Sequence, residues 1–148
     1  MHHGDGLFTA STGVRFHPGE LLLSLPLRLA AVLLMGAPVV GVLGFELIFG
    51  IANLFVHGDI DLPLPLERSL ERVLVTPALH RRHHGRSAQQ HGTNFGTIFS
   101  WWDRLLATFG ASSSVSSIAI GLDGVPRSLS FRGVLRLPFS ASRARVSG

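Results

Sequence analysis

The sequence of 148 residues contains no cysteine, no tyrosine and no lysine. Without cysteine the chain forms neither disulfides nor thiolate metal sites, so its composition says nothing about the redox compartment. Charged residues make up only 15% of the chain, whereas 46% are hydrophobic, and the mean hydropathy is positive. This balance is more typical of a membrane-embedded chain than of a soluble domain, and the length is that of a single domain.

The net charge of +4 comes from arginine alone, mainly Arg81, Arg82, Arg86 and a C-terminal series from Arg127 to Arg145. A basic balance can indicate a nucleic-acid partner, but such binders seldom carry a long apolar segment, and their basic patches usually include lysine. The positive-inside bias, in which arginines beside membrane segments stay on the cytoplasmic side, accounts better for the pattern. We therefore expect a membrane partner and no nucleic acid.

Residues 21–56 are almost wholly apolar, which is too long for one ordinary span of about 20 residues. Gly36, Ala37 and Pro38 form a helix-stop and turn signal near the middle. Two helical arms joined there would each be roughly 22–27 Å long, slightly short of a hydrocarbon core of about 30 Å. A transmembrane or re-entrant helical hairpin fits better than one span, and a buried helical pair in a soluble protein is the alternative.

Two charges, Arg28 and Glu46, lie inside this apolar segment. A charge within a membrane needs a partner or a watery cavity. Arg28 is long enough to extend its guanidinium toward the interface, whereas the sequence does not explain Glu46. A hairpin would return His17 and His57 to the same membrane face, and a single span would leave them on opposite faces.

Four of the eight histidines lie in the stretch TPALHRRHHGRSAQQHGTNFG, and three of them form an H-x-x-H-H pattern at His80, His83 and His84. Residues three and four apart share a helix face, so these imidazoles can point into one site. Thr76 as N-cap and Pro77 in the first turn favour a helix here. Neutral imidazole is a good ligand for iron, zinc, copper or nickel. The pattern alone is moderately specific, because histidine clusters in basic loops are often solvated surface.

The absence of known catalytic motifs disfavours several classes of enzyme. The sequence contains no H-E-x-x-H, no G-x-S-x-G and no P-loop, which disfavours a zincin metalloprotease in particular. Carboxylates near the histidines are few, which disfavours a carboxylate-bridged metal pair. The residues therefore favour an all-histidine or nearly all-histidine metal site beside a membrane hairpin, with a soluble histidine-based zinc hydrolase as a weaker alternative.

Five segments carry a resemblance to a known family. HHGDGLFTASTGVRFHPGE, NLFVHGDIDLP, VLVTPALHRRHHG, TNFGTIFSWWDRLLATF and IAIGLDG together resemble the fatty acid hydroxylase/sterol desaturase superfamily, and its bacterial sterol desaturase members most. The resemblance covers nearly the whole chain. It implies that residues 1–148 are the C-terminal part of an all-α integral membrane fatty acid hydroxylase domain, with a membrane hairpin at 21–56, a cytosolic histidine-box helical cap at 57–110 and a basic tail at 111–148.

The same resemblance implies a membrane-bound non-haem di-iron oxygenase. Such an enzyme uses O2 to hydroxylate or desaturate a C–H bond of a lipid, a sterol or a fatty acyl chain. Its active site would lie on the cytosolic face of a membrane, here the bacterial inner membrane. The electrons would come from a partner such as a cytochrome b5-like protein or a ferredoxin.

The family's metal-binding positions can be carried over residue by residue. Those that match its iron ligands are His2, His3, His57, His80, His83 and His84. His17 matches a motif histidine that is expected to be structural or to support the ligands, and Asn94 and Asp103 match positions expected to fix the loop behind the site. His91 matches no motif position and is expected at the surface.

The sequence departs from the family pattern at its start. An earlier box with two further histidines is missing, and the second box lacks the histidine expected three residues before His2. The resemblance thus implies a start at an internal methionine or a truncated gene. We expect the chain as written to bind metal weakly and to turn over poorly, whereas a form extended upstream would bind a pair of irons. A non-catalytic membrane scaffold that retains the fold is the alternative.

Three aromatic residues, Phe99, Trp101 and Trp102, follow the histidine boxes. They are typical of an interfacial aromatic group at a membrane surface. Ordinary core packing explains them nearly as well, so the sequence leaves both readings open.

Overall fold

The computed structural model describes residues 8–14, 16–111, 118–121, 133 and 136. In chain order its elements are the 3-10 helix η2 (Ala10–Val14) and the α-helices α1 (Pro18–Met35), α2 (Val39–Val56), α3 (Leu64–Leu70), α4 (Pro77–His83), α5 (Ala88–His91) and α6 (Trp101–Leu105). The described residues form no strand, only two isolated β-bridges, so the all-α prediction is confirmed for them. His2, His3 and nearly all of the predicted basic tail lie outside the described residues.

Local chemistry sets both ends of α1. His17 is its N-cap, and the His17 Nδ1 accepts a hydrogen bond from the backbone N–H of Gly19 at 3.0 Å. Pro18 occupies the first helical position, where its missing N–H costs nothing. At the other end Gly36 adopts φ 60°, a left-handed conformation that glycine tolerates best, and closes the helix. The turn predicted at 36–38 therefore separates α1 from α2.

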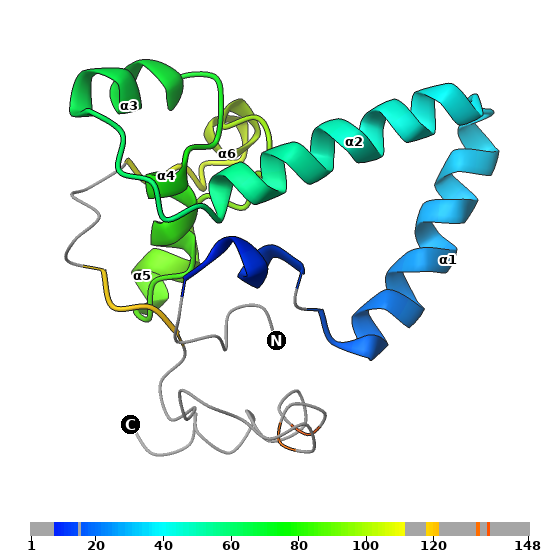
Figure 1. Cartoon of the computed structure of the whole chain (residues 1–148), viewed down its shortest axis with the longest axis horizontal. Helices are drawn as coiled ribbons and strands as arrows, with labels where there is room; N and C mark the ends of the chain where they lie inside the picture. Colours follow the sequence, from blue (N-terminus) through cyan, green and yellow to red (C-terminus); the bar gives the residue numbers. More distant parts are fainter. Residues whose placement is uncertain (1–7, 15, 112–117, 122–132, 134–135, 137–148) are drawn as a thin grey trace.

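Helices α1 and α2 are each 18 residues long and apolar enough to cross a membrane. Within the described structure α1 has no buried residue, and α2 buries only Val56. Figure 1 shows the two helices projecting from the part of the molecule that holds α3 to α6. The core helices of a soluble protein bury one face, so the alternative of a buried helical pair is wrong. The exposed apolar surface is that of a membrane protein.

The two charges of the apolar segment form an ion pair between the helices. The Nη1 atom of Arg28 lies 3.7 Å from the Oε1 atom of Glu46, although both side chains are about half exposed. The pair borders an apolar cleft of about 430 Å³ between α1 and α2, which Phe45 and Phe49 also line. Each charge is thus the partner that the other needs in an apolar environment, which answers the question that the sequence left open for Glu46.

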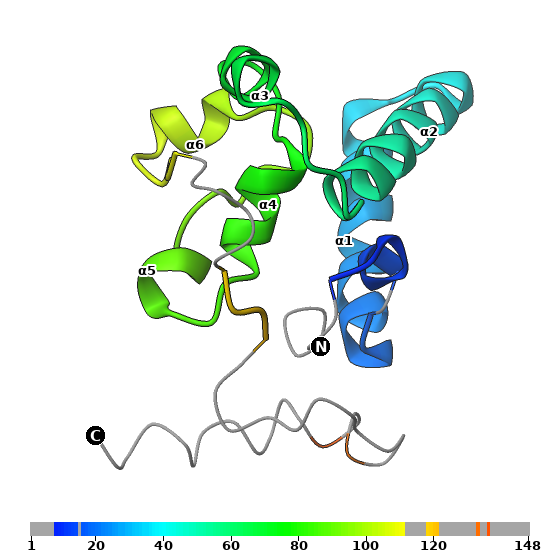
Figure 2. The same cartoon turned by 60° about the vertical axis from the view of Figure 1, so that its left-hand side comes forward.

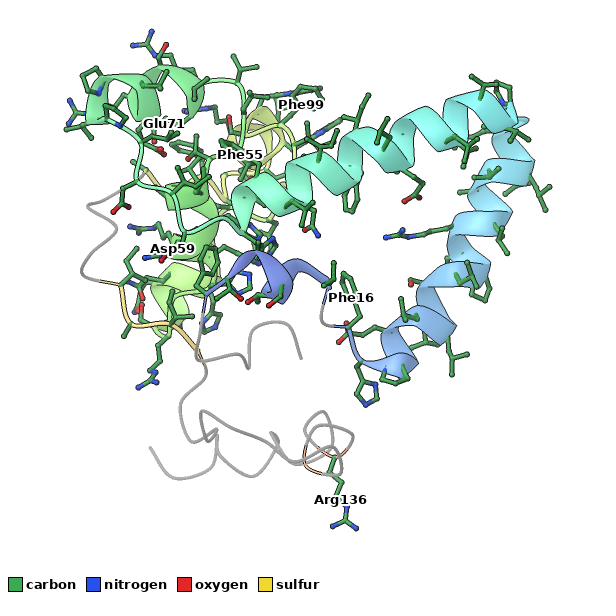
Figure 3. All side chains as sticks on the ribbon, in the orientation of Figure 1. Phe16, Phe55, Asp59, Glu71, Phe99 and Arg136 are labelled. Atoms are coloured by element: carbon green, nitrogen blue, oxygen red, sulfur yellow. The ribbon has the colours of Figure 1, made fainter. Side chains whose placement is uncertain are left out.

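The core lies where the C-terminal end of α2 meets α4. Val56, Val75 and Leu79 are fully buried there, with Phe55 and Phe109 packed against them. Figure 2 shows the end of α2 beside α4, and Figure 3 labels Phe55 at this junction. Because the last turn of an apolar helix is fixed against a histidine-bearing helix, the core also determines where the imidazoles meet.

We predict that the Arg28–Glu46 pair stabilises the position of α1 relative to α2 in a bilayer. Arg28→Leu or Glu46→Leu alone leaves one unpaired charge, which costs about 2.5–3.5 kcal/mol at a helix centre on insertion scales. The Arg28→Leu/Glu46→Leu double variant removes both charges and should recover most of that loss. The thermal midpoint of the protein in lipid nanodiscs measures the effect. Additive losses in the double variant would contradict a direct pairing.

Candidate metal centre

Helix α4 carries the H-x-x-H-H pattern, and its start is fixed as the sequence predicts. Thr76 is the N-cap, and its hydroxyl oxygen accepts a hydrogen bond from the backbone N–H of Leu79 at 3.3 Å. Pro77 occupies the first helical position. This cap satisfies one of the backbone donors that a helix leaves open at its N-terminus. The short helix therefore holds His80 and His83 in a defined orientation, and both are buried.

His57 reaches the same place from the other side of the core. It is the C-cap of α2 and only 1% exposed. Its Nδ1 atom lies 2.8 Å from the backbone carbonyl oxygen of Asn53. A carbonyl only accepts hydrogen bonds, so Nδ1 must carry the proton, and the lone pair is left on Nε2. A metal-binding histidine is normally held by such a hydrogen bond to its other ring nitrogen.

Three imidazoles converge at this point. One ring nitrogen from each of His57, His80 and His84 lies within 4.8 Å of the others, and all three residues are buried. The Nε2 atoms of His57 and His80 are 2.9 Å apart. Two imidazole nitrogens bound to one ion at about 2.0–2.1 Å lie roughly 3 Å from each other. The donor set and its spacing therefore fit one divalent transition metal ion.

His83 lies beside this cluster but is not one of its three converging residues. Its Nδ1 atom is 2.7 Å from the carbonyl oxygen of Thr93, so this nitrogen donates and the lone pair is on Nε2. Its ring stacks on His80 with centroids 5.5 Å apart and meets Phe95 edge to face. Of the three predicted ligands on α4 and at its C-cap, His80 and His84 converge with His57, and His83 lies next to them.

Phe8 forms a wall of the cluster. Its ring centroid lies 5.7 Å from that of His57 and 5.2 Å from that of His84, and the residue is buried. The guanidinium of Arg81 lies 5.1 Å from the Phe8 ring centroid and pairs with Asp59. An apolar ring beside the imidazoles keeps water from one side of the site.

The fatty acid hydroxylase family profile matches residues 1–108. The chain belongs to the fatty acid hydroxylase family. It is 33% identical over 141 residues to the ornithine lipid hydroxylase OlsE of Rhizobium tropici, a match that covers 95% of this chain and 41% of the relative. It is 29% identical over 114 residues to the alkylglycerol monooxygenase of Danio rerio, covering 76% of this chain and 24% of the relative. The chain thus spans less than half the length of these relatives, and no solved structure matches it.

Asn94 fastens the loop behind α4. It is buried, and its φ of 55° is unusual for a residue with a side chain. Its amide nitrogen donates to the carbonyls of Leu79 and Gly110 at 3.2 and 2.9 Å, and its amide oxygen accepts from the Gly110 N–H at 2.9 Å. These bonds join α4 to two separate loop segments. The loop includes Thr93, so Asn94 also sets the position of the carbonyl that orients His83.

Asp103 organises the same loop from α6. Its two carboxylate oxygens accept hydrogen bonds from the backbone N–H groups of Phe95 and Gly96 at 2.7 and 3.0 Å, and the hydroxyl of Thr108 donates to it at 2.7 Å. Asp103 is buried, so these donors compensate for the lost water. The carboxylate thus holds the loop rather than pointing at the imidazoles.

Glu67 is a buried carboxyl that was not predicted from the sequence. It lies on α3, and the Thr76 hydroxyl donates a hydrogen bond to its Oε1. Burial raises its pKa most, the Thr76 hydrogen bond lowers it, and the nearby Glu71 raises it further, with a net increase. Thr76 therefore connects α3 to the first turn of the histidine helix.

Two further described histidines, His17 and His91, are not among the converging imidazoles, and some supporting residues were not predicted. His17 caps α1 and His91 is exposed at the end of α5, as expected for a surface position. Phe8, Asn53 and Glu67 were not selected from the sequence. The carbonyl of Asn53 could not be selected from residue types, because every residue has a backbone carbonyl. The only sequence signal is its spacing, since Asn53 lies four residues before His57, as in a helical hydrogen bond.

We predict that the protein loses stability as Glu67 ionises. The folded-state pKa of Glu67 is raised, so its contribution is present at low pH and is lost as the pH rises through that pKa. Glu67→Gln stays neutral and can still accept from Thr76. Its thermal midpoint should exceed that of the parent above the raised pKa, and the difference should shrink as the pH falls.

The matched control is Asp61→Asn, which removes an exposed carboxylate from the loop before α3. This change should leave the pH dependence as it is in the parent. A difference between Glu67→Gln and the parent that does not vary with pH would show that the buried carboxyl does not titrate in this way.

Proposed function

We propose that this chain forms the metal-binding part of a membrane-bound non-haem di-iron oxygenase, which hydroxylates or desaturates a lipid C–H bond with O2. The observation that carries the proposal is the convergence of His57, His80 and His84 at the base of two helices long and apolar enough to span a membrane. Family membership supports it, because the profile covers this whole region. The alternative of a non-catalytic scaffold has no such reason to bury three converging imidazoles.

Two groups of histidines would hold the iron pair. His57, His80 and His84 would bind one ion, and His83, whose Nε2 lone pair is set by Thr93, would contribute to the second with His2 and His3. Phe8 supports the last two assignments, because it lies against the imidazole cluster and His3 is five residues before it. An extended chain covers about 3.3–3.6 Å per residue, so His3 is within reach of the site.

The protein's own residues would orient the imidazoles and enclose the metal site. Bound iron would supply O2 activation and the oxidation of the C–H bond. The Asn53 and Thr93 carbonyls hold the protonated nitrogens of His57 and His83, so the other ring nitrogens stay available as ligands. Phe8 and the core around Val56 keep bulk water from the imidazoles.

The substrate we propose is a membrane lipid with a polar group. The two relatives are named as a hydroxylase of ornithine lipid and a monooxygenase of alkylglycerol, which share an aliphatic lipid with a polar head. Helices α1 and α2 would form the proposed hairpin in the bacterial inner membrane and place the histidines at its cytosolic face, next to lipid. Two electrons would come from a separate donor, such as a cytochrome b5-like protein or a ferredoxin.

The function is tested by lipid oxidation. The protein, and a form extended upstream, are reconstituted in lipid nanodiscs with ferrous iron, a ferredoxin reducing system and ornithine lipid, and products are detected by mass spectrometry. A product heavier by one oxygen, labelled when ¹⁸O2 is used, supports a hydroxylase, and one lighter by two hydrogens supports a desaturase. Iron bound by the extended form without oxidation of any lipid offered would favour the scaffold.

We predict that metal binding depends on the converging imidazoles. We expect at least about tenfold weaker binding of ferrous iron in each of three single variants, His57→Gln, His80→Gln and His84→Gln. Each variant removes a direct metal ligand, and loss of a residue that only hydrogen-bonds to a ligand already weakens metal binding by about tenfold or more. Elemental analysis after equilibrium dialysis measures the bound iron. His91→Gln is the matched control, because His91 is exposed on α5. Equal iron binding in all four variants would rule the site out.

A further inference from the structure

The exposed apolar side chains outside α1 and α2 are unevenly distributed. Large hydrophobic residues are exposed on α3 and α6, whereas Leu79 of α4 is buried. Further large hydrophobic residues are exposed in η2 and in the connecting segments, at Val14, Phe16, Ile60, Val73, Phe95 and Phe99. We define the α3–α6 surface by its six exposed residues, Leu64, Leu66, Trp101, Trp102, Leu105 and Leu106. Exposed apolar patches of this kind mark a contact with a partner or a membrane rather than chance.

Hydrogen bonds make α3 and α6 neighbours. The Ser100 hydroxyl donates to the carbonyl oxygen of Glu71 at 2.7 Å, and the Ser100 N–H donates to that of Val73 at 3.0 Å. The guanidinium of Arg104 reaches the same Glu71 carbonyl at 3.0 Å. Because Ser100 precedes α6 and Glu71 follows α3 directly, the end of α3 lies beside the start of α6, and Figures 1 and 2 show the two helices near each other.

The two tryptophans lie on the outside of the fold. Trp101 and Trp102 stack on each other, with ring centroids 4.3 Å apart, and are 41% and 52% exposed. Ordinary core packing, one of the two readings that the sequence allowed, is therefore wrong for this pair. Indole rings combine a large apolar face with one N–H donor, which suits the boundary between lipid chains and water.

Arginines accompany the apolar residues. Arg68 and Arg72 are exposed on α3 and on the turn after it. Arg104 is exposed on α6, where its guanidinium donates to the Glu71 carbonyl and stacks on the Phe109 ring. Guanidinium groups bind phosphate well and are attracted to anionic lipid surfaces. A layer of phospholipid headgroups over acyl chains complements both the exposed indoles and the exposed cations.

The position of the surface agrees with a bilayer. In Figures 1 and 2, both α3 and the turn between α1 and α2 lie above α4, and α5 lies below it. In Figure 3, Glu71 and Phe99 lie on this same side, away from Asp59. When α1 and α2 enter a membrane with their turn leading, this side of the histidine-bearing part turns towards the bilayer.

We propose that the α3–α6 surface rests in the headgroup layer of the membrane, with the indoles of Trp101 and Trp102 at the boundary between headgroups and acyl chains. The contact is a second attachment, separate from α1 and α2. It fixes the histidine cluster at a constant height and tilt above the lipid. It needs only a bilayer as partner and stands whether or not the iron site is active.

The chain supplies its own probes, because these are its only two tryptophans. The full chain is reconstituted in nanodiscs of phosphatidylethanolamine and phosphatidylglycerol. Parallel samples carry lipid brominated either near the headgroup end of the acyl chain or near its terminal methyl. We expect shallow bromine to quench tryptophan fluorescence at least about twofold more than deep bromine, as interfacial indoles require, and aqueous iodide to quench weakly.

A matched control places a tryptophan on the opposite side. In a Trp101→Phe/Trp102→Phe background, Gln89→Trp puts one indole at an exposed position of α5, which should be quenched by iodide and not by brominated lipid. The single variants Trp101→Phe and Trp102→Phe report each native indole separately. Strong iodide quenching of the native pair would overturn the proposal, because the surface would face water. Protection from both quenchers would overturn it too, because a protein segment or a second copy would cover the surface.

Discussion

The hydroxyl of Thr76 links the elements that position the histidines. It accepts the Leu79 N–H and so starts α4, and it donates to Glu67 and so ties α3 to the same turn. The orientations of His80 and His84 follow from where α4 begins, because a helix fixes side-chain directions along its length. A histidine site built on a helix of seven residues depends strongly on its cap, since short helices are marginal on their own.

The apolar helices and the histidine cluster are parts of one arrangement. His57 ends α2, so the depth and tilt of that helix in a membrane also set the position of one imidazole. The Arg28–Glu46 pair joins α1 to α2, and the α3–α6 surface offers a second contact with lipid. The proposed oxidation of a membrane lipid would need such a buried, oriented set of nitrogens next to the bilayer.

The features that depend on neighbouring residues could be predicted from the sequence. The turn at 36–38, the cap at Thr76 and the helix that presents His80 follow from short-range rules for glycine, proline and capping residues. The family was also recognisable, because several motifs occur in order along the chain, and the family match confirms it. The proposed roles of the individual histidines stay predictions.

The features that could not be predicted depend on contacts between residues far apart in the sequence. The partner of Glu46 is Arg28, eighteen positions away, and no local pattern shows whether two charges face each other. His57 is oriented by a backbone carbonyl, which every residue possesses, and burial of Glu67 depends on how α3 folds back on α4. Whether Trp101 is exposed or packed is a property of the surrounding fold. Such features become visible only when the chain is seen in three dimensions.

The central claim is that the converging imidazoles bind iron directly. X-ray absorption at the iron edge, recorded on the iron-loaded protein in nanodiscs, tests it most directly. We predict nitrogen ligands at about 2.0–2.2 Å with the outer-shell scattering of imidazole rings, and a marked loss of that scattering in His80→Gln. Oxygen ligands alone, or a spectrum that His80→Gln leaves unchanged, would contradict the claim.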